Sequence, residues 1–406
     1  MTMKYHLIII ALFTGFTLSC ERDMSPEQAD RFIKFYGDYL MDEAGDMEAL
    51  DDGGFAICGV ASLPDIGKRM VLVVTDEYGN LRSGYPKYYP DTDTLAEAAA
   101  NTVVPIRGGQ GGYLLAGYIE RPVDGTVNTQ KDIYLVKVSN AGTINWERIY
   151  GSARDEEILH ATERISSGFI LAGYKVLEEG SDILVMGIEQ EGDSITQLNE
   201  HPYAKNSSAN YILNIGVGYI CVCSYDKLGG REGTDILTLT LNDQNDQFDF
   251  AVKYLTGDSN EEASCVVKDE SNNFLVLGNR LTASRSEIVI YQIQTEDDIL
   301  EPPSSVQVAT ISESNVNLTG KRVVKTKDGR FAILGTRESG NGREILLQFL
   351  TTDYDPAERV LFGASGDQYG ADIDVPEEGG IVMLGTTDSG ENSMISLIKT
   401  NDTGDL

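Results

Sequence analysis

Short apolar runs, separated by glycine-rich polar turns, follow one another along almost the whole chain. One run, typically a glycine-aromatic pair followed by apolar residues and a small residue, recurs seven times at spacings of 50 to 58 residues. Self-similarity at such a period indicates an array of repeats. The aromatic position, or the isoleucine that replaces it, falls at Phe55, Tyr113, Phe169, Tyr219, Phe274, Phe331 and Ile381.

A second apolar run follows each copy, and an acidic residue opens five of the seven, as in residues 182–188. Glycine, asparagine and aspartate divide each repeat into four short runs, without a helix-length apolar period between them. Four strands in about 54 residues match one blade of a β-propeller. The pattern therefore predicts an all-β fold, a seven-bladed β-propeller of four-stranded blades.

The last repeat is incomplete, because only two strands fit between Ile381 and the end of the sequence. Residues 31–36 have the spacing of an outer strand: Tyr36 precedes Phe55 by 19 residues, as the corresponding residues do in the third repeat. We predict that this N-terminal strand completes blade seven and closes the ring. A helix is the alternative, because residues 25–28 combine a capping serine with an early proline.

The N-terminal residues have the pattern of a bacterial lipoprotein signal. Lys4 precedes an apolar run over residues 7–16, which is too short to span a bilayer. The run leads to Ser19 and Cys20, which resemble a lipobox, although Thr17 stands where leucine is usual. Acyl chains on Cys20 would anchor the protein to a membrane, and ordinary signal cleavage nearby is the alternative. The expected segments are a signal peptide over 1–19, a tether over 20–30 and the propeller over 31–406.

The chain of 406 residues has 64 acidic and 32 basic residues, for a net charge of −32. This charge argues against nucleic acid as a partner, because proteins bind phosphates through Lys and Arg. No GxSxG, HExxH or P-loop pattern occurs, and neither a CxxC pair nor a complete calcium loop is present. We therefore expect no metal and no cofactor.

Four cysteines follow Cys20, and an even number in an exported protein allows disulfides. Cys221 and Cys223 lie two residues apart on one predicted strand, so they cannot easily join each other. Together with Cys58 they occupy small or apolar positions of the repeat. We expect these three and Cys265 to be free and buried.

The glycine-aromatic strand and the acidic-apolar strand that follows it resemble the repeats of secreted and lipid-anchored β-propeller proteins of Bacteroidetes-type bacteria. The resemblance covers residues 31–406. It implies a propeller in the bacterial cell envelope, as an outer-membrane lipoprotein on the periplasmic or the surface side. Proteins of this kind do unrelated jobs, so the resemblance implies little about activity.

Candidate binding residues lie in the loops that join the second strand of each blade to the third. These loops, for example 119–130 and 336–342, are expected to be long and to share one face of the ring, where function usually collects. Their arginines could clamp an anionic ligand, and pairing with acidic residues of neighbouring loops is the alternative. Three tyrosines could form a stacking platform for a sugar or could pack between blades. The candidates are Arg121, Arg231, Arg280, Arg337, Tyr118, Tyr174 and Tyr225.

The sequence favours a ligand-binding or protein-binding scaffold module over an enzyme. Charges on the innermost strands, such as Glu48, Glu163, Lys268 and Lys325, come from different blades and give no sign of clustering. The expected partners are the membrane, through the lipid anchor, and a glycan, a peptide or another envelope protein. The alternative is a carbohydrate-active enzyme, a polysaccharide lyase or hydrolase, with its site at the channel. A close pair of carboxylates there, or a histidine beside a carboxylate, would favour that alternative.

Overall fold

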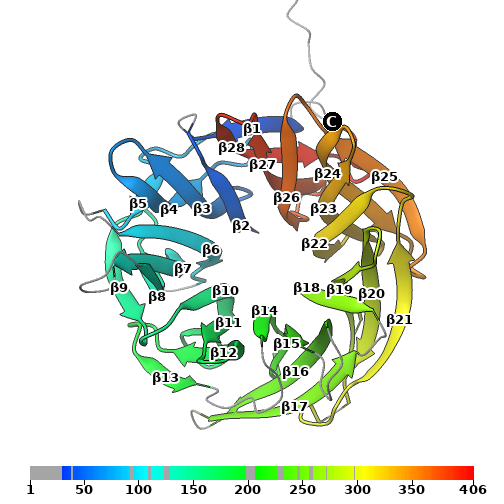
Figure 1. Cartoon of the computed structure of the whole chain (residues 1–406). Coiled ribbons are helices and arrows are strands. Elements are labelled where there is room, and N and C mark those ends of the chain that lie inside the picture. The colour runs from blue at the N-terminus through cyan, green and yellow to red at the C-terminus, as the bar shows by residue number, and fades with distance from the viewer. Residues whose placement is uncertain are drawn as a thin grey trace, which may run out of the picture.

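Seven four-stranded antiparallel sheets are arranged in a ring around a central axis in the computed structural model (Figure 1). This confirms the predicted seven-bladed β-propeller. From the inner to the outer strand, blade 1 contains β2 (Glu43–Ala49), β3 (Phe55–Leu63), β4 (Gly67–Val74) and β5 (Lys87–Tyr89), and blade 2 contains β6 (Glu97–Pro105), β7 (Tyr113–Pro122), β8 (Thr129–Val138) and β9 (Ile144–Tyr150). Blade 3 contains β10 (Glu156–Glu163), β11 (Phe169–Val176), β12 (Ser181–Ile188) and β13 (Ser194–Gln197), and blade 4 contains β14 (Ser208–Asn214), β15 (Tyr219–Asp226), β16 (Thr234–Gln244) and β17 (Gln247–Leu255).

The remaining blades have the same order. Blade 5 contains β18 (Asn260–Lys268), β19 (Asn273–Leu281), β20 (Ser286–Gln294) and β21 (Ser304–Ile311), and blade 6 contains β22 (Asn317–Lys325), β23 (Phe331–Ser339), β24 (Gly342–Leu350) and β25 (Pro356–Phe362). Blade 7 contains β26 (Asp367–Asp374), β27 (Ile381–Asp388), β28 (Ser393–Thr400) and β1 (Phe32–Tyr36).

The structure describes residues 30–37, 40–91, 96–107, 111–122, 129–197, 206–226, 233–244, 247–255, 259–270, 272–296 and 298–406. The expected signal peptide, Cys20 and Arg231 lie outside these residues. Within them, no helix is long and apolar enough to cross a membrane.

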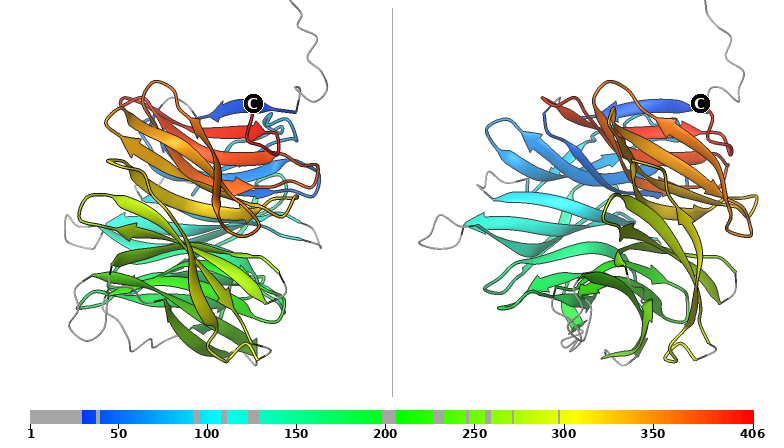
Figure 2. Two further views of the ribbon diagram at one scale, coloured as in Figure 1. Left: turned by 90° about the vertical axis from the view of Figure 1, so that its right-hand side faces the viewer. Right: turned by 45° about the vertical axis from the view of Figure 1, so that its right-hand side comes forward.

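The N-terminal strand closes the ring, as predicted, and the alternative of a helix is wrong for Phe32–Tyr36. β1 pairs antiparallel with β28 over its whole length, with Phe32 opposite Lys399 and Tyr36 opposite Ile395. The two strands lie side by side at one edge of the ring (Figure 2). The Tyr36 hydroxyl also donates to the Gly79 carbonyl at 2.7 Å, which ties blade 7 to blade 1. The first and last parts of the propeller therefore hold each other.

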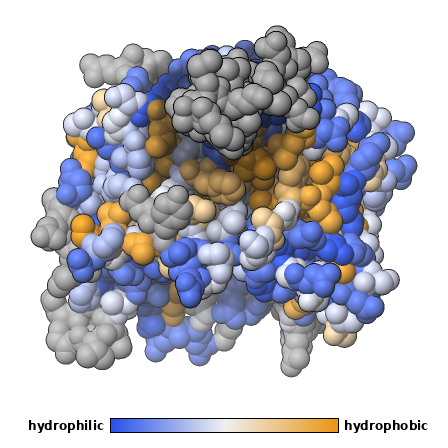
Figure 3. Space-filling model, turned by 90° about the horizontal axis from the view of Figure 1, so that it is seen from above, coloured by the Kyte–Doolittle hydropathy of each residue, from blue (hydrophilic) through white to orange (hydrophobic). Residues whose placement is uncertain are grey.

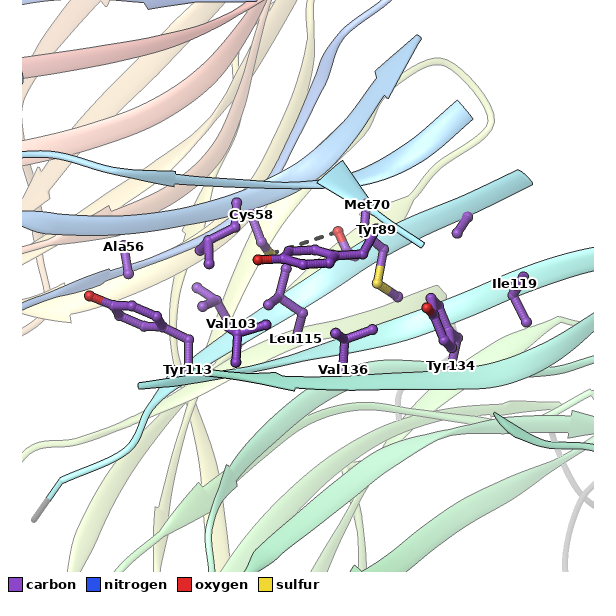
Figure 4. Packing of buried hydrophobic residues seen from close by; sticks show 14 of the residues in the cluster. Ala56, Cys58, Met70, Tyr89, Val103, Tyr113, Leu115, Ile119, Tyr134 and Val136 are labelled. Carbon is purple, nitrogen blue, oxygen red and sulfur yellow. Dashed lines mark hydrogen bonds between the residues drawn. The ribbon is translucent and has the colours of Figure 1, made fainter. Parts of the chain in front are cut away.

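Blades pack face to face through apolar side chains that alternate along each strand. Between blades 1 and 2, Met70 and Tyr89 point toward Leu115 and Tyr134 (Figure 4). The Tyr89 hydroxyl donates to the Gly142 carbonyl of the next blade at 2.7 Å. Leu115 is fully buried, and burying such a side chain contributes about 2 kcal/mol. The apolar residues at alternate positions of each strand thus form the interface between blades.

The four described cysteines are free and buried, as expected. Cys221 and Cys223 point the same way from β15, with their Sγ atoms 3.6 Å apart. They pack in the apolar layer between blades 3 and 4. Cysteine therefore serves here as a small apolar residue.

One expected long loop is absent. Residues 336–342 were predicted to be irregular, but β23 continues to Ser339 and β24 begins at Gly342, so that only two residues form the turn. An ion pair supports the longer pairing of β23 with β24, because Arg337 lies opposite Glu344 and its guanidinium is 2.9 Å from the carboxylate. The prediction failed because charged strand ends resemble loop sequence.

Candidate functional site

Each innermost strand contains a β-bulge at the same level of the channel. The bulge brings the inner strand so close to the second strand that the repeat needs glycine there. A Cβ atom on Gly335 would lie 1.9 Å from the Thr319 carbonyl oxygen, and one on Gly173 would lie 1.9 Å from that of Glu157. The glycine that ends most copies of the repeat motif is thus a consequence of the bulge.

The residues that directly follow the bulges form a belt around the channel, one from each blade, and six of the seven are buried. Side chains of this kind bridge one blade to the next. The Asp46 carboxylate accepts hydrogen bonds from the Thr102 hydroxyl at 2.8 Å and the Val103 amide at 3.1 Å. The belt consists of Asp46, Thr102, His160, Tyr211, Cys265, Arg322 and Asp372.

Arg322 holds two carboxylates of the belt together. Its guanidinium lies 3.3 Å from Asp372 and 3.8 Å from Asp46. Asp372 also accepts the Met47 amide at 2.9 Å, so this cluster joins blade 6 to blades 7 and 1. On its other side the guanidinium lies over the Tyr211 ring, 4.9 Å from the ring centre. All of these groups are desolvated, so each charge must be balanced within the cluster.

The two carboxyl groups share one proton. Burial and the neighbouring Asp46 anion raise the pKa of Asp372 well above its usual range. Burial also opposes ionisation of Asp46, but the neighbouring His160, then Arg322 and hydrogen bonds from Asp372 and Thr102, lower the Asp46 pKa. The cluster therefore contains one guanidinium cation, one carboxylate anion and one neutral carboxylic acid.

His160 is neutral and belongs to the same belt. Its ring stacks on Tyr211 with the ring centres 3.7 Å apart, and its Nδ1 accepts the Ile212 amide at 3.4 Å. Burial lowers the His160 pKa to about 3, so it carries no charge near neutral pH. The electrostatic stabilisation of the Asp46 anion is accordingly assigned to Arg322.

The expectation that inner-strand charges are scattered is wrong. Asp46, Arg322 and Asp372 come from blades 1, 6 and 7 but meet in one cluster. Sequence analysis did not identify them, although a short signal exists. In six repeats an alanine or glycine stands two residues before the belt residue, as in Ala44-Gly45-Asp46 and Gly320-Lys321-Arg322. This pattern marks the bulge.

A cavity of about 740 Å³ opens beside the belt. The seven residues inserted at the bulges all contribute to its lining, together with Arg322 and polar side chains such as Asn279 and Thr319. Three exposed or half-exposed carboxylates, Glu43, Glu262 and Asp388, also line it. The bulge residues are Gly45, Asn101, Leu159, Asn210, Ser264, Lys321 and Ala371.

The cavity and the described N-terminal end lie on opposite faces of the ring. Ser393, at the start of β28, lines the cavity, whereas Phe32 pairs with Lys399 near the other end of that strand. Arg31 donates to the carbonyl of the C-terminal Leu406 at 3.3 Å. The rim in this region exposes apolar surface (Figure 3), and Phe35 is 52% exposed.

Glu48 lies two residues beyond Asp46 on β2 and is only partly accessible to solvent. Burial, and then the carboxylates of Asp46 and Asp374, raise its pKa to about 8. Arg107 and Arg322 oppose this shift. Glu48 is thus largely protonated at neutral pH.

The predicted arginines that the structure describes, Arg121, Arg280 and Arg337, do not line this cavity. Each described one has a carboxylate partner. Arg121 pairs with Asp132 and Arg280 with Glu261 at 2.8 Å, each on an adjacent strand of the same blade, and Arg337 pairs with Glu313. Binding of a ligand by these arginines stays a prediction.

The predicted tyrosines also lie outside the cavity lining. Lys131 lies 3.8 Å from the centre of the Tyr118 ring, and the Tyr174 hydroxyl donates to Glu157 at 2.8 Å. Tyr225 is 2% exposed and packs against Tyr254. Each therefore has a partner within the propeller, and a sugar platform stays a prediction.

No protein-family model matches the chain, and no curated protein is detectably related to it by sequence. Among solved structures, it is similar to a protein of unknown function from Dyadobacter fermentans, with 9% identity, a TM-score of 0.51 and coverage of 90% of this chain and 98% of that one. It is also similar to a puromycin hydrolase, with 13% identity, a TM-score of 0.52 and coverage of 85% of this chain and 50% of that one. At these identities the similarity shows the fold alone.

Proposed function

We propose that this protein is a non-catalytic binding module of the bacterial cell envelope, anchored by a lipid on Cys20, whose propeller takes its ligand in the channel cavity. The main support is that consecutive residues at the bulges have different surroundings. The inserted residues line a cavity of about 740 Å³, whereas the carboxylates that follow them are buried away from it. A rigid ring that opens a polar cavity on one face suits recognition of a hydrophilic ligand.

The position of the N-terminal strand supports this arrangement. β1 starts on the face opposite to the cavity, and the tether of residues 20–30 would leave from there. A lipid on Cys20 would therefore direct the cavity away from the membrane, where a glycan, a peptide or another envelope protein can reach it.

An enzyme is the second candidate, because Asp46 and Asp372 are two carboxyl groups joined through Arg322. Their oxygens, however, accept backbone amides, and neither residue lines the cavity. The carboxylates that do line it are Glu43, Glu262 and Asp388, which come from three blades. Among the described residues, no hydrogen bond or ion pair links these three to one another, whereas acid-base catalysis requires a defined pair.

The test compares binding to arrays of glycans and peptides for the wild type and two tryptophan variants. Thr319 is exposed at the cavity, and Thr319→Trp would fill part of it. Ser305 is exposed on the outer strand β21, and Ser305→Trp is the matched control. We expect bound probes to be recovered chemically unchanged and to be lost from the Thr319 variant only. Binding that survives Thr319→Trp would contradict the proposed site, and conversion of a bound probe would favour the enzyme.

Anchoring is tested separately, in the native host. We expect Cys20→Ala to leave the chain unacylated and to release it from membranes. Cys58→Ala is the control, because Cys58 is buried within the propeller. A Cys20→Ala chain that stays on membranes through a high-salt wash would refute the lipid anchor.

A further inference from the structure

Lys321 is the one charged residue among the seven that the bulges place in the cavity lining. Its side chain is exposed to the solvent in the cavity, which is lined by residues of all seven blades. Burial within the ring and then the neighbouring Arg322 lower its pKa, while Asp372 and Asp46 oppose this change. The ammonium group therefore stands where it is less well solvated than at the outer surface.

Within the described part of the chain, no side chain or carbonyl forms a hydrogen bond or an ion pair with the Lys321 ammonium. Lys325, four residues further along β22, pairs instead with Asp269 at 2.6 Å. Arg322 is also satisfied, because its charge is balanced by the carboxylates described above. One positive charge with three donors is consequently left for a ligand.

Two amides of the same lining have complementary free groups. Asn101 donates both hydrogen bonds of its amide nitrogen, to Glu157 at 2.8 Å and the Ile158 carbonyl at 2.7 Å, which leaves its oxygen as an acceptor. The Asn210 oxygen accepts from Ser208 and from the Ser224 amide, which leaves its nitrogen as a donor. A donor and an acceptor together suit the hydroxyl groups of a ligand.

We propose that Lys321 binds a carboxylate, and that the ligand of this cavity is a uronic acid or a glycan that contains one. This inference rests on the proposed binding function and adds the chemical class of the ligand. Lys321 is the one described cation of the lining without an ion-pair partner, and a single carboxylate matches its charge. A phosphate dianion would bring a second negative charge close to the carboxylates of Glu43 and Glu262 at the same cavity. The polar amides would contact the sugar hydroxyls.

The experiment is a ligand-observed NMR titration of the propeller with D-glucuronate and D-glucose, which differ in a carboxylate at C6. We expect D-glucuronate to bind about 10- to 100-fold more tightly than D-glucose, the range for one charge-assisted hydrogen-bonded contact. Lys321→Gln should reduce D-glucuronate binding to the level of D-glucose. Lys268→Gln, on the inner strand of the neighbouring blade and outside the cavity lining, should leave it unchanged. Thermal unfolding of each variant verifies that it is folded.

Three results would overturn the inference: equal binding of the two sugars, D-glucuronate binding that Lys321→Gln does not weaken, or tighter binding of inorganic phosphate than of D-glucuronate. Absence of D-glucuronate binding up to its solubility would overturn it as well. The proposed function fails on a different result, because it requires only that some array ligand is lost on Thr319→Trp. A ligand that is lost from that variant but kept by Lys321→Gln would retain the binding function and reject the carboxylate.

Discussion

Replacing Arg322 by methionine tests whether the belt is a structural clamp. Arg322 is 8% exposed and is the cation that balances Asp46 beside the protonated Asp372. Methionine keeps much of the apolar volume of the side chain but removes the charge and all of its donors. The change therefore leaves a buried carboxylate without its counter-ion.

The expected loss of unfolding free energy is about 3 kcal/mol. Breaking a buried ion pair by removing one partner costs roughly 3–5 kcal/mol. The lower end applies, because Asp46 and Asp372 already share a proton and the remaining anion can be neutralised by a second one. In the folded variant the Asp46 carboxylate lacks its counter-ion, so it will bind a proton more tightly than in the unfolded chain. The stability of the variant should therefore decrease as pH rises from about 5 to about 8.

The assay is urea unfolding at both pH values. Arg322→Met combined with Asp46→Asn, which removes the unbalanced anion, should recover at least half of the loss and abolish the added pH dependence. Arg330→Met is the control, because its ion pairs with Asp328 and Glu358 lie at the surface, where such pairs contribute about 0–1 kcal/mol. A loss below about 1 kcal/mol for Arg322→Met, or no recovery in the double variant, would refute the charge balance described here.

Three further predictions concern the bulge, a buried acid and the closure of the ring. Gly335→Ala should cost about 2–3 kcal/mol of unfolding free energy, because the new methyl group would meet the Thr319 carbonyl oxygen, whereas Gly340→Ala, with no atom within 4 Å, should be nearly neutral. Equal effects of the two variants in denaturant unfolding would contradict the close approach of the two strands at the bulge. Wild-type stability should fall between pH 4.5 and pH 8, because folded Glu48 retains its proton to about pH 8. The Glu48→Gln variant should therefore match the wild type at acid pH and exceed its unfolding free energy by about 2 kcal/mol above pH 8, and identical pH profiles of the two proteins would exclude the raised Glu48 pKa. Deletion of residues 21–38 removes β1 and exposes the edge of β28, so the unfolding temperature should drop by roughly 5 °C or more relative to the same chain without the deletion. An unchanged temperature would argue against closure by this strand.

Much of the fold could be predicted because each blade is specified locally. The period of the glycine-aromatic motif, the alternation along each strand and the turn residues act within about 50 residues. Ring closure could be predicted for the same reason, since Tyr36 has the spacing to Phe55 that an outer strand requires. The free, buried state of Cys221 and Cys223 also follows from their apolar positions on one strand.

The binding site could be predicted far less well. The candidate arginines are predicted from their place in loops, and nothing in a linear sequence shows that Arg280 already has Glu261 as its partner. The inner-strand charges show no clustering in a linear sequence, because Arg322 and Asp372 come from successive blades 50 residues apart and Asp46 lies near the other end of the chain. Only closure of the ring brings Asp46 of the first blade to Arg322 and Asp372 of the last two.

The sequence by itself therefore determined the blades, their number and the strand that closes them, because strand patterns and turns depend on neighbours along the chain. The tertiary structure decided where the bulges turn side chains. At each bulge one residue enters the cavity and the next enters the belt, so Lys321 is left free for a ligand while Arg322 is neutralised by two carboxylates. The physical reason is that burial and charge balance in the channel depend on residues from several blades at once, whereas the fold of each blade depends mainly on its own.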